Sequence, residues 1–269
     1  MFLLDNVKSV VAVASGKGGV GKSTVAVNLA LAMHAEGQKI GLLDADIYGP
    51  SIAMMFGVSD QDRPKSLDGQ TILPLVTHGV STMSIGYLVD SKTPMVWRGP
   101  MASGALKQML QHTNWGSLDV LLVDMPPGTG DIHLTLSQSA QLAGAVIVTT
   151  PQDIALLDAK RSIEMFAKVE VPVLGIIENM SAMQCSVCGN HVAVFGSGGG
   201  ERMAQSYQTK LLGQLPLDPQ VREQGDIGTP IVLTQLQAPV VKSYVSIARA
   251  LIERLSNKES NGSPDIIFE

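Results

Sequence analysis

The stretch Gly16-Lys17-Gly18-Gly19-Val20-Gly21-Lys22-Ser23 decides the fold of this chain. It fits the pattern G-x-x-x-x-G-K-[ST] of a phosphate-binding loop, in which glycines let backbone N–H groups approach an anion closely. The apolar residues 10–13 before the loop favour a strand, and residues 24–35 after it favour a helix. This motif requires a strand, a glycine turn and a helix N-terminus in that order. The sequence therefore predicts a nucleotide site, and a chance glycine-rich turn is the weaker alternative.

The residue types of the loop suit a triphosphate with its metal ion. Lys22 is expected to reach the β- and γ-phosphate oxygens, and the Ser23 hydroxyl is expected to bind Mg²⁺. The helix that opens near Gly21 adds partial positive charge at its N-terminus. The residues expected to contact the nucleotide follow one another along the chain: Gly16, Lys17, Gly18, Gly19, Val20, Gly21, Lys22, Ser23 and Thr24.

Acidic residues end two further apolar runs. Asp124 follows the run 120–123, an arrangement typical of a carboxylate that coordinates Mg²⁺ directly or through water. The turn after it, residues 126–130, either senses the γ-phosphate as a switch or simply leads into the next helix. Asp44 and Asp46 follow the run 40–43. A helix cap near residue 51 is the alternative role for Asp46.

Apolar runs alternate with helical patterns along the whole chain. This order predicts an α/β fold with a mostly parallel central sheet and helices on both faces. We expect a single domain over residues 1–255, ending in a helix over 240–255, and a polar tail over 256–269. The further expected strands are 145–149, 173–177 and 211–215, and the further expected helices are 103–111, 132–141 and 154–168.

Composition excludes several classes of function. The 269 residues carry a net charge of −5 and show no run of Lys and Arg, so binding to nucleic acid has no electrostatic support. The chain has no apolar stretch of about eighteen residues, so no membrane span is expected. The short N-terminal segment before the first strand does not resemble a signal peptide, and we expect a cytoplasmic protein.

The only two cysteines, Cys185 and Cys188, form a C-x-x-C pair in a segment, residues 183–191, that is expected to be a loop. Such a pair can bind one metal centre, but iron–sulfur clusters and structural zinc usually take four ligands. A symmetric homodimer would supply four sulfurs. The alternatives are a zinc site that adds His191 and a redox-active or inert pair.

The loop K-G-G-x-G-K-[ST] resembles the deviant Walker A class, which includes MinD, ParA-type partition ATPases, nitrogenase iron protein and ArsA. The resemblance implies that Lys17 reaches across a dimer interface to the partner's nucleotide. It implies that Asp44 holds Mg²⁺ through water and that Asp46 positions or activates the attacking water. It also implies that Asn179, at the end of a predicted strand, recognises adenine through its amide, with Asp218 nearby.

Over nearly its whole length the chain resembles the Mrp/ApbC family of iron–sulfur cluster carrier ATPases. The resemblance implies a P-loop NTPase fold and a homodimer that holds a labile [4Fe-4S] cluster between two C-x-x-C pairs, Cys185 and Cys188 of each chain. It implies transfer of the cluster to apo-proteins with slow, coupled ATP hydrolysis, in which Lys17, Lys22 and Asp46 act catalytically. The matching stretches are 16–24, 44–51, Val96-Trp97-Arg98-Gly99-Pro100-Met101, 124–131, Glu178-Asn179-Met180-Ser181, 185–189, Phe195-Gly196 and Gly228-Thr229-Pro230.

Two other functions compete with the carrier. A spatial-organising ATPase of the MinD or ParA type would need a basic amphipathic C-terminal helix for a membrane, or a basic surface for DNA. The last predicted helix has an apolar stripe but few cations, and the chain is acidic. The second alternative is a nucleotide-dependent zinc-binding scaffold without transfer chemistry.

Overall fold

The computed structural model describes residues 4–59, 61–88 and 99–261. Within them, eight strands form one sheet that is parallel throughout except where the edge strand β3 pairs with β4, so the predicted mostly parallel sheet is confirmed. In spatial order the strands are β10 (Leu211–Gln214), β7 (Val173–Glu178), β6 (Gly144–Thr149), β1 (Val7–Ala14), β5 (Leu118–Asp124), β2 (Ile40–Asp44), β4 (Val80–Ser84) and β3 (Leu75–Thr77).

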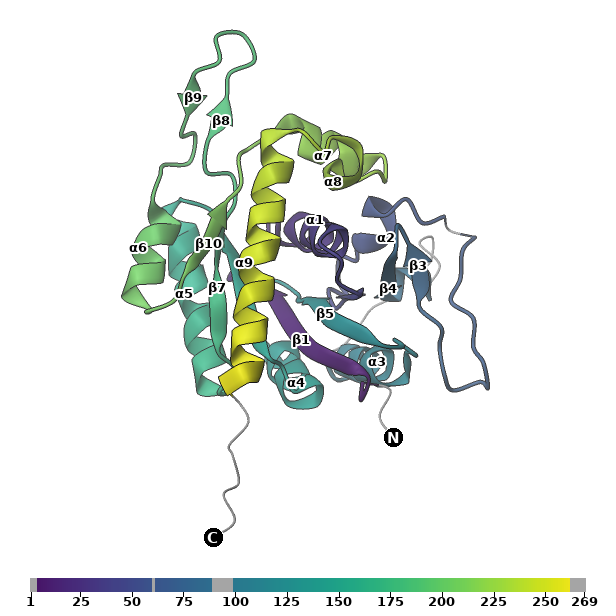
Figure 1. The fold of residues 1–269 in the computed structure, drawn as a ribbon. Coiled ribbons are helices and arrows are strands. Elements are labelled where there is room, and N and C mark those ends of the chain that lie inside the picture. The colour runs from purple at the N-terminus through teal and green to yellow at the C-terminus, as the bar shows by residue number, and fades with distance from the viewer. Residues whose placement is uncertain (1–3, 60, 89–98, 262–269) are drawn as a thin grey trace.

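Helices cover both faces of this sheet (Figure 1). Alternation along β1 explains the two layers, because Val11 and Val13 point into one apolar core while Val10 and Ala12 point into the other. The first core holds α1 (Lys22–Ala35), α2 (Ile52–Met55), α8 (Ile231–Thr234) and α9 (Pro239–Asn261); the second holds α3 (Gly99–His112), α4 (Asp131–Ala140), α5 (Asp153–Lys168) and α6 (Gly199–Ser206).

Two expectations about local structure need correction. The segment expected to be a loop around the cysteines is a β-hairpin of β8 (Met183–Gln184) and β9 (His191–Val192). The final helix does not stop at residue 255 but continues to Asn261, and the rest of the expected tail, residues 262–269, lies outside the described residues. Residues 96–98 of the family-like stretch also lie outside them.

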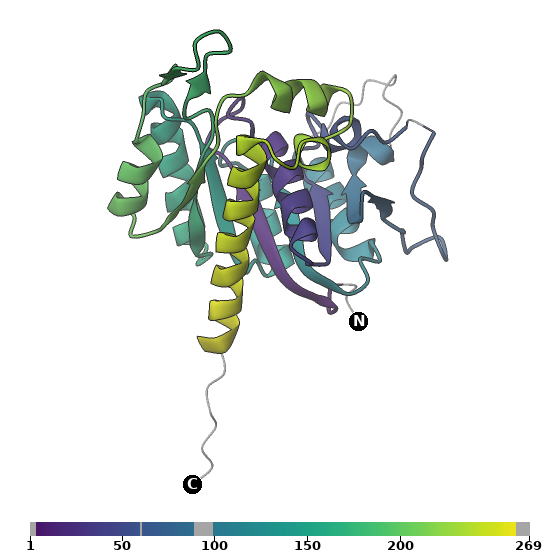
Figure 2. The same cartoon turned by 45° about the horizontal axis from the view of Figure 1, so that its top comes forward.

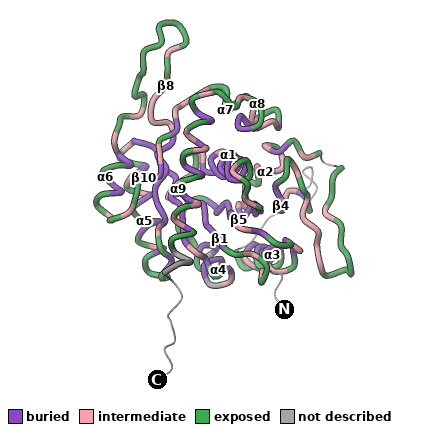
Figure 3. Tube along the Cα trace, viewed as in Figure 1, coloured by how far each residue is buried: buried purple, intermediate pink, exposed green. Residues whose placement is uncertain are grey.

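The hairpin stands away from the body of the molecule in both ribbon views (Figures 1 and 2). Its residues are exposed or half-buried, in contrast to the buried central strands (Figure 3). In the part of the chain that the structure describes, no helix is long and apolar enough to cross a membrane.

The strand order places the predicted site. β1 lies between β5 and β6, so the connections from β1 to β2 and from β5 to β6 leave in opposite directions across the sheet. Ligands of open α/β sheets bind outside the carboxyl ends of the strands at such a switch point. The loop after β1, Asp44 at the end of β2 and Asp124 at the end of β5 all lie at that edge.

Candidate functional site

The loop between β1 and α1 depends on glycine for its shape. Gly19 and Gly21 have φ angles of 83° and 79°, a region that side chains disfavour, and Gly21 caps the N-terminus of α1. Gly16 lies directly against the backbone of α5, where an added Cβ would overlap the Asp158 carbonyl group. The loop is therefore held against α5 while its N–H groups remain available at the helix N-terminus.

Lys22 and Asp124 form a buried ion pair at the centre of the site. Lys22 Nζ lies 2.6 Å from Asp124 Oδ1 and 3.2 Å from Ser23 Oγ, and the two charged side chains are 6% and 0% exposed. Asp124 Oδ2 is buried and has no hydrogen-bond partner within the described residues. An unpartnered buried carboxylate oxygen beside a serine hydroxyl fits Mg²⁺, which prefers such oxygen ligands.

Asp44 is adjacent to Asp124 in the register of β2 and β5 and is fully buried. Its carboxylate accepts hydrogen bonds from Ser84 Oγ at 3.0 Å, from the Ile52 N–H at 3.3 Å and from the Asp46 N–H at 3.2 Å. Burial, followed by repulsion from Asp124, raises the pKa of Asp44 to about 7. Burial likewise raises the pKa of Asp124, against the opposing effect of the Lys22 ammonium.

Asp46 is half-buried and follows Asp44 into the turn before α2. The alternative role considered for it, a cap on the next helix, falls instead to Asp44, whose Oδ2 accepts from the first residue of α2, Ile52. Ser51, at the N-cap position, makes no side-chain capping bond. Asp46 therefore keeps its carboxylate free of the helix cap that was the competing assignment.

Asn179 joins the loop to a neighbouring cavity. Its Nδ2 donates to the Val20 carbonyl at 2.9 Å, which leaves the second amide hydrogen and Oδ1 for a ligand. Asn179 and Gly21 line a cavity of about 210 Å³ with Met54 and Met55 of α2. The opposite wall comes from the segment 216–218 and from α7 (Pro219–Asp226), whose N-terminus is capped by Asp218. Sequence reasoning placed Asn179 and Asp218 here but missed α2 and α7.

Lys17 is the second lysine of the loop, and it is half-buried. Its own carbonyl accepts from Ser15 Oγ at 2.9 Å, which fixes the backbone at this position. Among the described residues no hydrogen bond or ion pair engages its ammonium. The Lys17 ammonium therefore has no partner among the described residues of its own chain, whereas the Lys22 ammonium pairs with Asp124.

The cysteine pair lies in the turn of the β8–β9 hairpin. Both thiols are free, with Cys185 half-buried and Cys188 exposed. Hydrogen bonds from the backbone N–H groups of Cys188 and Val187 hold the pKa of the Cys185 thiol below its ordinary value. The Gly189 N–H closes the turn onto the Cys185 carbonyl at 2.9 Å, with Gly189 at a φ of 74°. The turn thus favours the thiolate form of Cys185 more than an ordinary environment would.

His191 does not complete a metal site with these thiols. In the described ranges no group of three or more His, Cys, Asp or Glu side chains is arranged to hold a metal ion. One chain therefore brings two sulfurs to a site, and the zinc alternative lacks the third ligand that was suggested for it.

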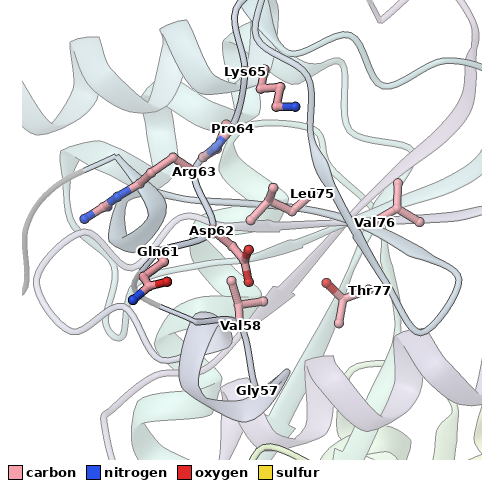
Figure 4. A pocket seen from close by; sticks show the side chains of 10 residues that line it. All are labelled: Gly57, Val58, Gln61, Asp62, Arg63, Pro64, Lys65, Leu75, Val76 and Thr77. Carbon is pink, nitrogen blue, oxygen red and sulfur yellow. The ribbon is translucent and has the colours of Figure 1, made fainter.

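A second hollow of about 670 Å³ lies away from these elements (Figure 4). It is lined by Gly57 and Val58, by residues 61–65 and by the edge strand β3. The figure shows Asp62 and Thr77 facing the same space, with Arg63 directed outward. None of the predicted site residues lines it.

Comparison with known proteins adds the family to this geometry. The family model described as ParA, NUBPL iron-transfer P-loop NTPase, matches residues 6–252. The chain belongs to this family. The matched region contains the phosphate-binding loop, the acidic residues at the ends of β2 and β5, Asn179 and the cysteine hairpin. The resemblance expected from the sequence is therefore confirmed.

Relatives within the iron-transfer family are similar over most of their length. An iron–sulfur cluster carrier protein of Escherichia coli is 58% identical over 253 residues, which are 94% of this chain and 67% of that protein. The iron–sulfur cluster transfer protein NUBPL of Dictyostelium discoideum is 44% identical, with 98% of this chain and 84% of that protein covered.

Solved structures place the family among known nucleotide-binding folds. A nucleotide-binding protein of Archaeoglobus fulgidus in complex with ADP superposes with a TM-score of 0.76 at 35% identity, covering 90% of this chain and 92% of that chain. The cell division ATPase MinD of Pyrococcus furiosus has a TM-score of 0.67 at 20% identity, covering 91% and 99%. The second likeness shows the shared fold alone.

Proposed function

We propose that this chain binds and hydrolyses ATP and carries a labile [4Fe-4S] cluster at a homodimer interface, from which it delivers the cluster to apo-proteins. One observation carries the proposal: a free C-x-x-C pair stands on a projecting hairpin that leaves the sheet after β7, and the phosphate-binding motif follows β1 in the same sheet. Membership of an iron-transfer family, and relatives named as cluster carriers, support the same function.

A few residues of the phosphate-binding loop and of the neighbouring strand ends each have a separate role in hydrolysis. The N–H groups at the start of α1 bind the phosphates, and Lys22 leaves Asp124 to neutralise charge on the β- and γ-phosphates. Ser23 and Asp124 would hold Mg²⁺, with Asp44 behind them. When bound, this ion neutralises charge that develops on the phosphate oxygens. Asp46 orients the attacking water.

Lys17 is assigned to the partner's nucleotide in the assembled dimer. Its ammonium makes no hydrogen bond or ion pair with the described residues of its own chain, whereas Lys22 forms an ion pair with Asp124. A cation supplied from a second chain can stabilise the charge of a phosphoryl-transfer transition state. Hydrolysis then depends on association of two copies.

The cluster is the cargo of this cycle. Each chain supplies Cys185 and Cys188, and two chains supply the four thiolates that a cubane cluster takes. Because each hairpin contributes half of the ligands, separation of the two hairpins weakens the binding of the cluster and favours its release to an acceptor with its own thiolates. The spatial-organising ATPase is the weaker candidate, because it gives the cysteine pair no task.

Anaerobic reconstitution with ferrous iron and sulfide tests the cargo. The wild type should bind about four iron and four sulfide per two chains, with broad visible absorption. Cys185→Ala and Cys188→Ala should lose the absorption, while Ser186→Ala, a change in the same turn that removes no thiol, should retain it. A colourless wild type that binds zinc would overturn the carrier in favour of the scaffold.

Transfer to an apo-acceptor tests the role of the nucleotide. The cluster-loaded Lys22→Ala variant should transfer more slowly than the wild type with ATP, because the loop can no longer bind the triphosphate productively. The wild type without ATP is the matched comparison. Equal transfer rates in all three samples would refute the coupling of ATP to delivery while leaving cluster binding intact.

A further inference from the structure

Glu178 is a buried acid that the nucleotide site does not use. It is the last residue of β7 and is completely buried. Its Oε2 accepts the Gly200 N–H at 2.5 Å, and its Oε1 accepts Gln214 Nε2 at 2.7 Å. A buried carboxylate is costly unless it is well hydrogen-bonded, and here both oxygens are occupied. The two bonds fix Glu178 between the start of α6 and strand β10.

These contacts lie at the root of the cysteine hairpin. The chain leaves the sheet after Glu178, forms the hairpin of β8 and β9, and returns to the body at α6. The bond from the Gly200 N–H therefore joins the segment that enters the hairpin to the segment that leaves it. Glycine gives a close fit at this point, because a Cβ at Gly200 would lie 3.0 Å from the Cβ of Glu178, and one of the two would have to shift by a few tenths of an ångström.

The next residue along the chain contacts the phosphate-binding loop. Asn179 Nδ2 donates to the Val20 carbonyl at 2.9 Å, and its side chain points away from that of Glu178, as alternation requires. The dipeptide Glu178-Asn179 thus contacts the nucleotide loop on one side and the root of the hairpin on the other. The Asn179 N–H is itself fixed to the Thr149 carbonyl at 2.7 Å.

We propose that Glu178 is a positioning residue that transmits the nucleotide state of the phosphate-binding loop to the cysteine hairpin. The proposal deepens the proposed function and rests on its assignment of nucleotide to the loop. A ligand that moves the Val20 carbonyl displaces Asn179 and therefore Glu178. Because Glu178 ties both ends of the hairpin, the displacement changes the orientation of the hairpin.

Thiol alkylation of the metal-free protein tests this directly, because Cys185 and Cys188 are the only cysteines in the chain. The alkylation rate with a non-hydrolysable ATP analogue should differ from the rate with ADP by about fivefold in the wild type. Glu178→Ala should lose this difference, with its affinity for the analogue unchanged. Gly200→Ala should also reduce it, from the other side of the same contact.

Glu178→Gln is the conservative control. Its amide oxygen can accept the Gly200 N–H while its amide nitrogen donates to Gln214, whose own amide turns over. This variant should keep the difference in alkylation rate between the two nucleotides. If the protein needed the negative charge of Glu178 rather than its hydrogen bonds, the variant would lose that difference. Loss in Glu178→Gln, retention in Glu178→Ala, or a wild type whose alkylation ignores the nucleotide would each overturn the proposal.

The readout separates this proposal from the carrier function. Alkylation needs no iron, so a protein that fails to bind a cluster can still show the nucleotide effect. Conversely, a protein that binds and delivers a cluster with nucleotide-independent alkylation retains the carrier function and loses the role of Glu178. Thermal unfolding identifies any variant that fails to fold. If Glu178→Ala is one of them, the alkylation rates of Glu178→Gln and Gly200→Ala decide whether the proposal holds.

Discussion

At the scale of single residues, the site is a buried cluster of charges that do not cancel. Lys22, Asp44 and Asp124 lie together in the interior, with two acids for one ammonium. Burial raises the pKa of both acids, because the protein interior solvates the charged forms poorly. Repulsion from Asp124 adds to this effect at Asp44, and repulsion from Asp46 adds to it at Asp124. The arrangement is suited to an incoming cation, which would relieve the repulsion.

The raised pKa of Asp44 predicts a pH-dependent stability. Between the unfolded pKa of about 4 and the folded value of about 7, the folded protein keeps a proton that the unfolded chain has lost. The free energy of unfolding should therefore fall as pH rises through this window, by up to about 1.4 kcal/mol per pH unit. Above pH 7 this contribution should be constant.

Urea denaturation of the nucleotide-free and metal-free protein at several pH values from 5 to 8 measures the effect. Asp44→Asn, which cannot ionise, should show a shallower decline than the wild type over the same range. Because Asp44 and Asp124 repel one another, the difference between the two proteins reports the titration of Asp44 together with its effect on Asp124. Parallel curves would contradict the assignment.

At the scale of elements, the phosphate-binding loop and α5 are packed without space between them. Gly16→Ala should destabilise the nucleotide-free protein by about 1–3 kcal/mol, because its Cβ overlaps the backbone of Asp158. Gly18→Ala in the same loop is the control, since the nearest atom to its Cβ is 4.0 Å away on Pro127. Chemical denaturation compares the free energies of unfolding of the two variants. Equal values would show that α5 shifts at little cost to accommodate the added Cβ.

The sequence predicts helices and strands well where the apolar pattern is long. It predicts them poorly where an element is short or depends on contacts with distant parts of the chain. The strand, loop and helix around the phosphate-binding motif were predicted close to their observed bounds. The hairpin was missed because each of its strands has only two residues. The final helix was ended early because polar residues 256–261 show no apolar periodicity, although a helix can continue in solvent.

The candidate site was predicted to a similar extent. Motif residues such as Lys22 and Asp124 are adjacent in space as expected. Nothing in the sequence indicated that Ser84 contacts Asp44, and Glu178 appeared only as part of a family-like stretch. The partners of these residues, Asp44 and Gly200, are distant in the sequence. From the sequence alone, an acidic residue at a strand end looks identical whether its carboxylate binds a metal ion, caps a helix N-terminus or has no partner.

At the scale of the whole molecule, the proposal requires two copies, and this can be tested with inactive variants. Lys22→Ala should fail to bind ATP productively, and Lys17→Ala should bind ATP but fail to hydrolyse it. A mixed dimer contains one complete site, with nucleotide on the Lys17→Ala chain and Lys17 from the other. Mixing should restore up to about a quarter of wild-type activity, because half of randomly paired dimers are mixed and each has one complete site.

Phosphate release measured across a series of mixing ratios checks this prediction. Activity should peak near equal amounts and vanish at either extreme. No recovery at any ratio, in samples where sedimentation shows mixed dimers, would mean that Lys17 acts within its own chain. Hydrolysis by the Lys17→Ala protein alone would mean that Lys17 is not needed.

The place of β1 in the strand order gives the molecule a division of labour. The flank of β5, β2 and β4 carries Asp124 and Asp44, while the flank of β6, β7 and β10 carries Asn179 and the root of the hairpin. The tip of the hairpin makes none of the contacts described for Asp44 and Asp124, so its length can differ without altering those contacts. The same sheet and nucleotide loop can thus support proteins that present different chemical groups from this one connection.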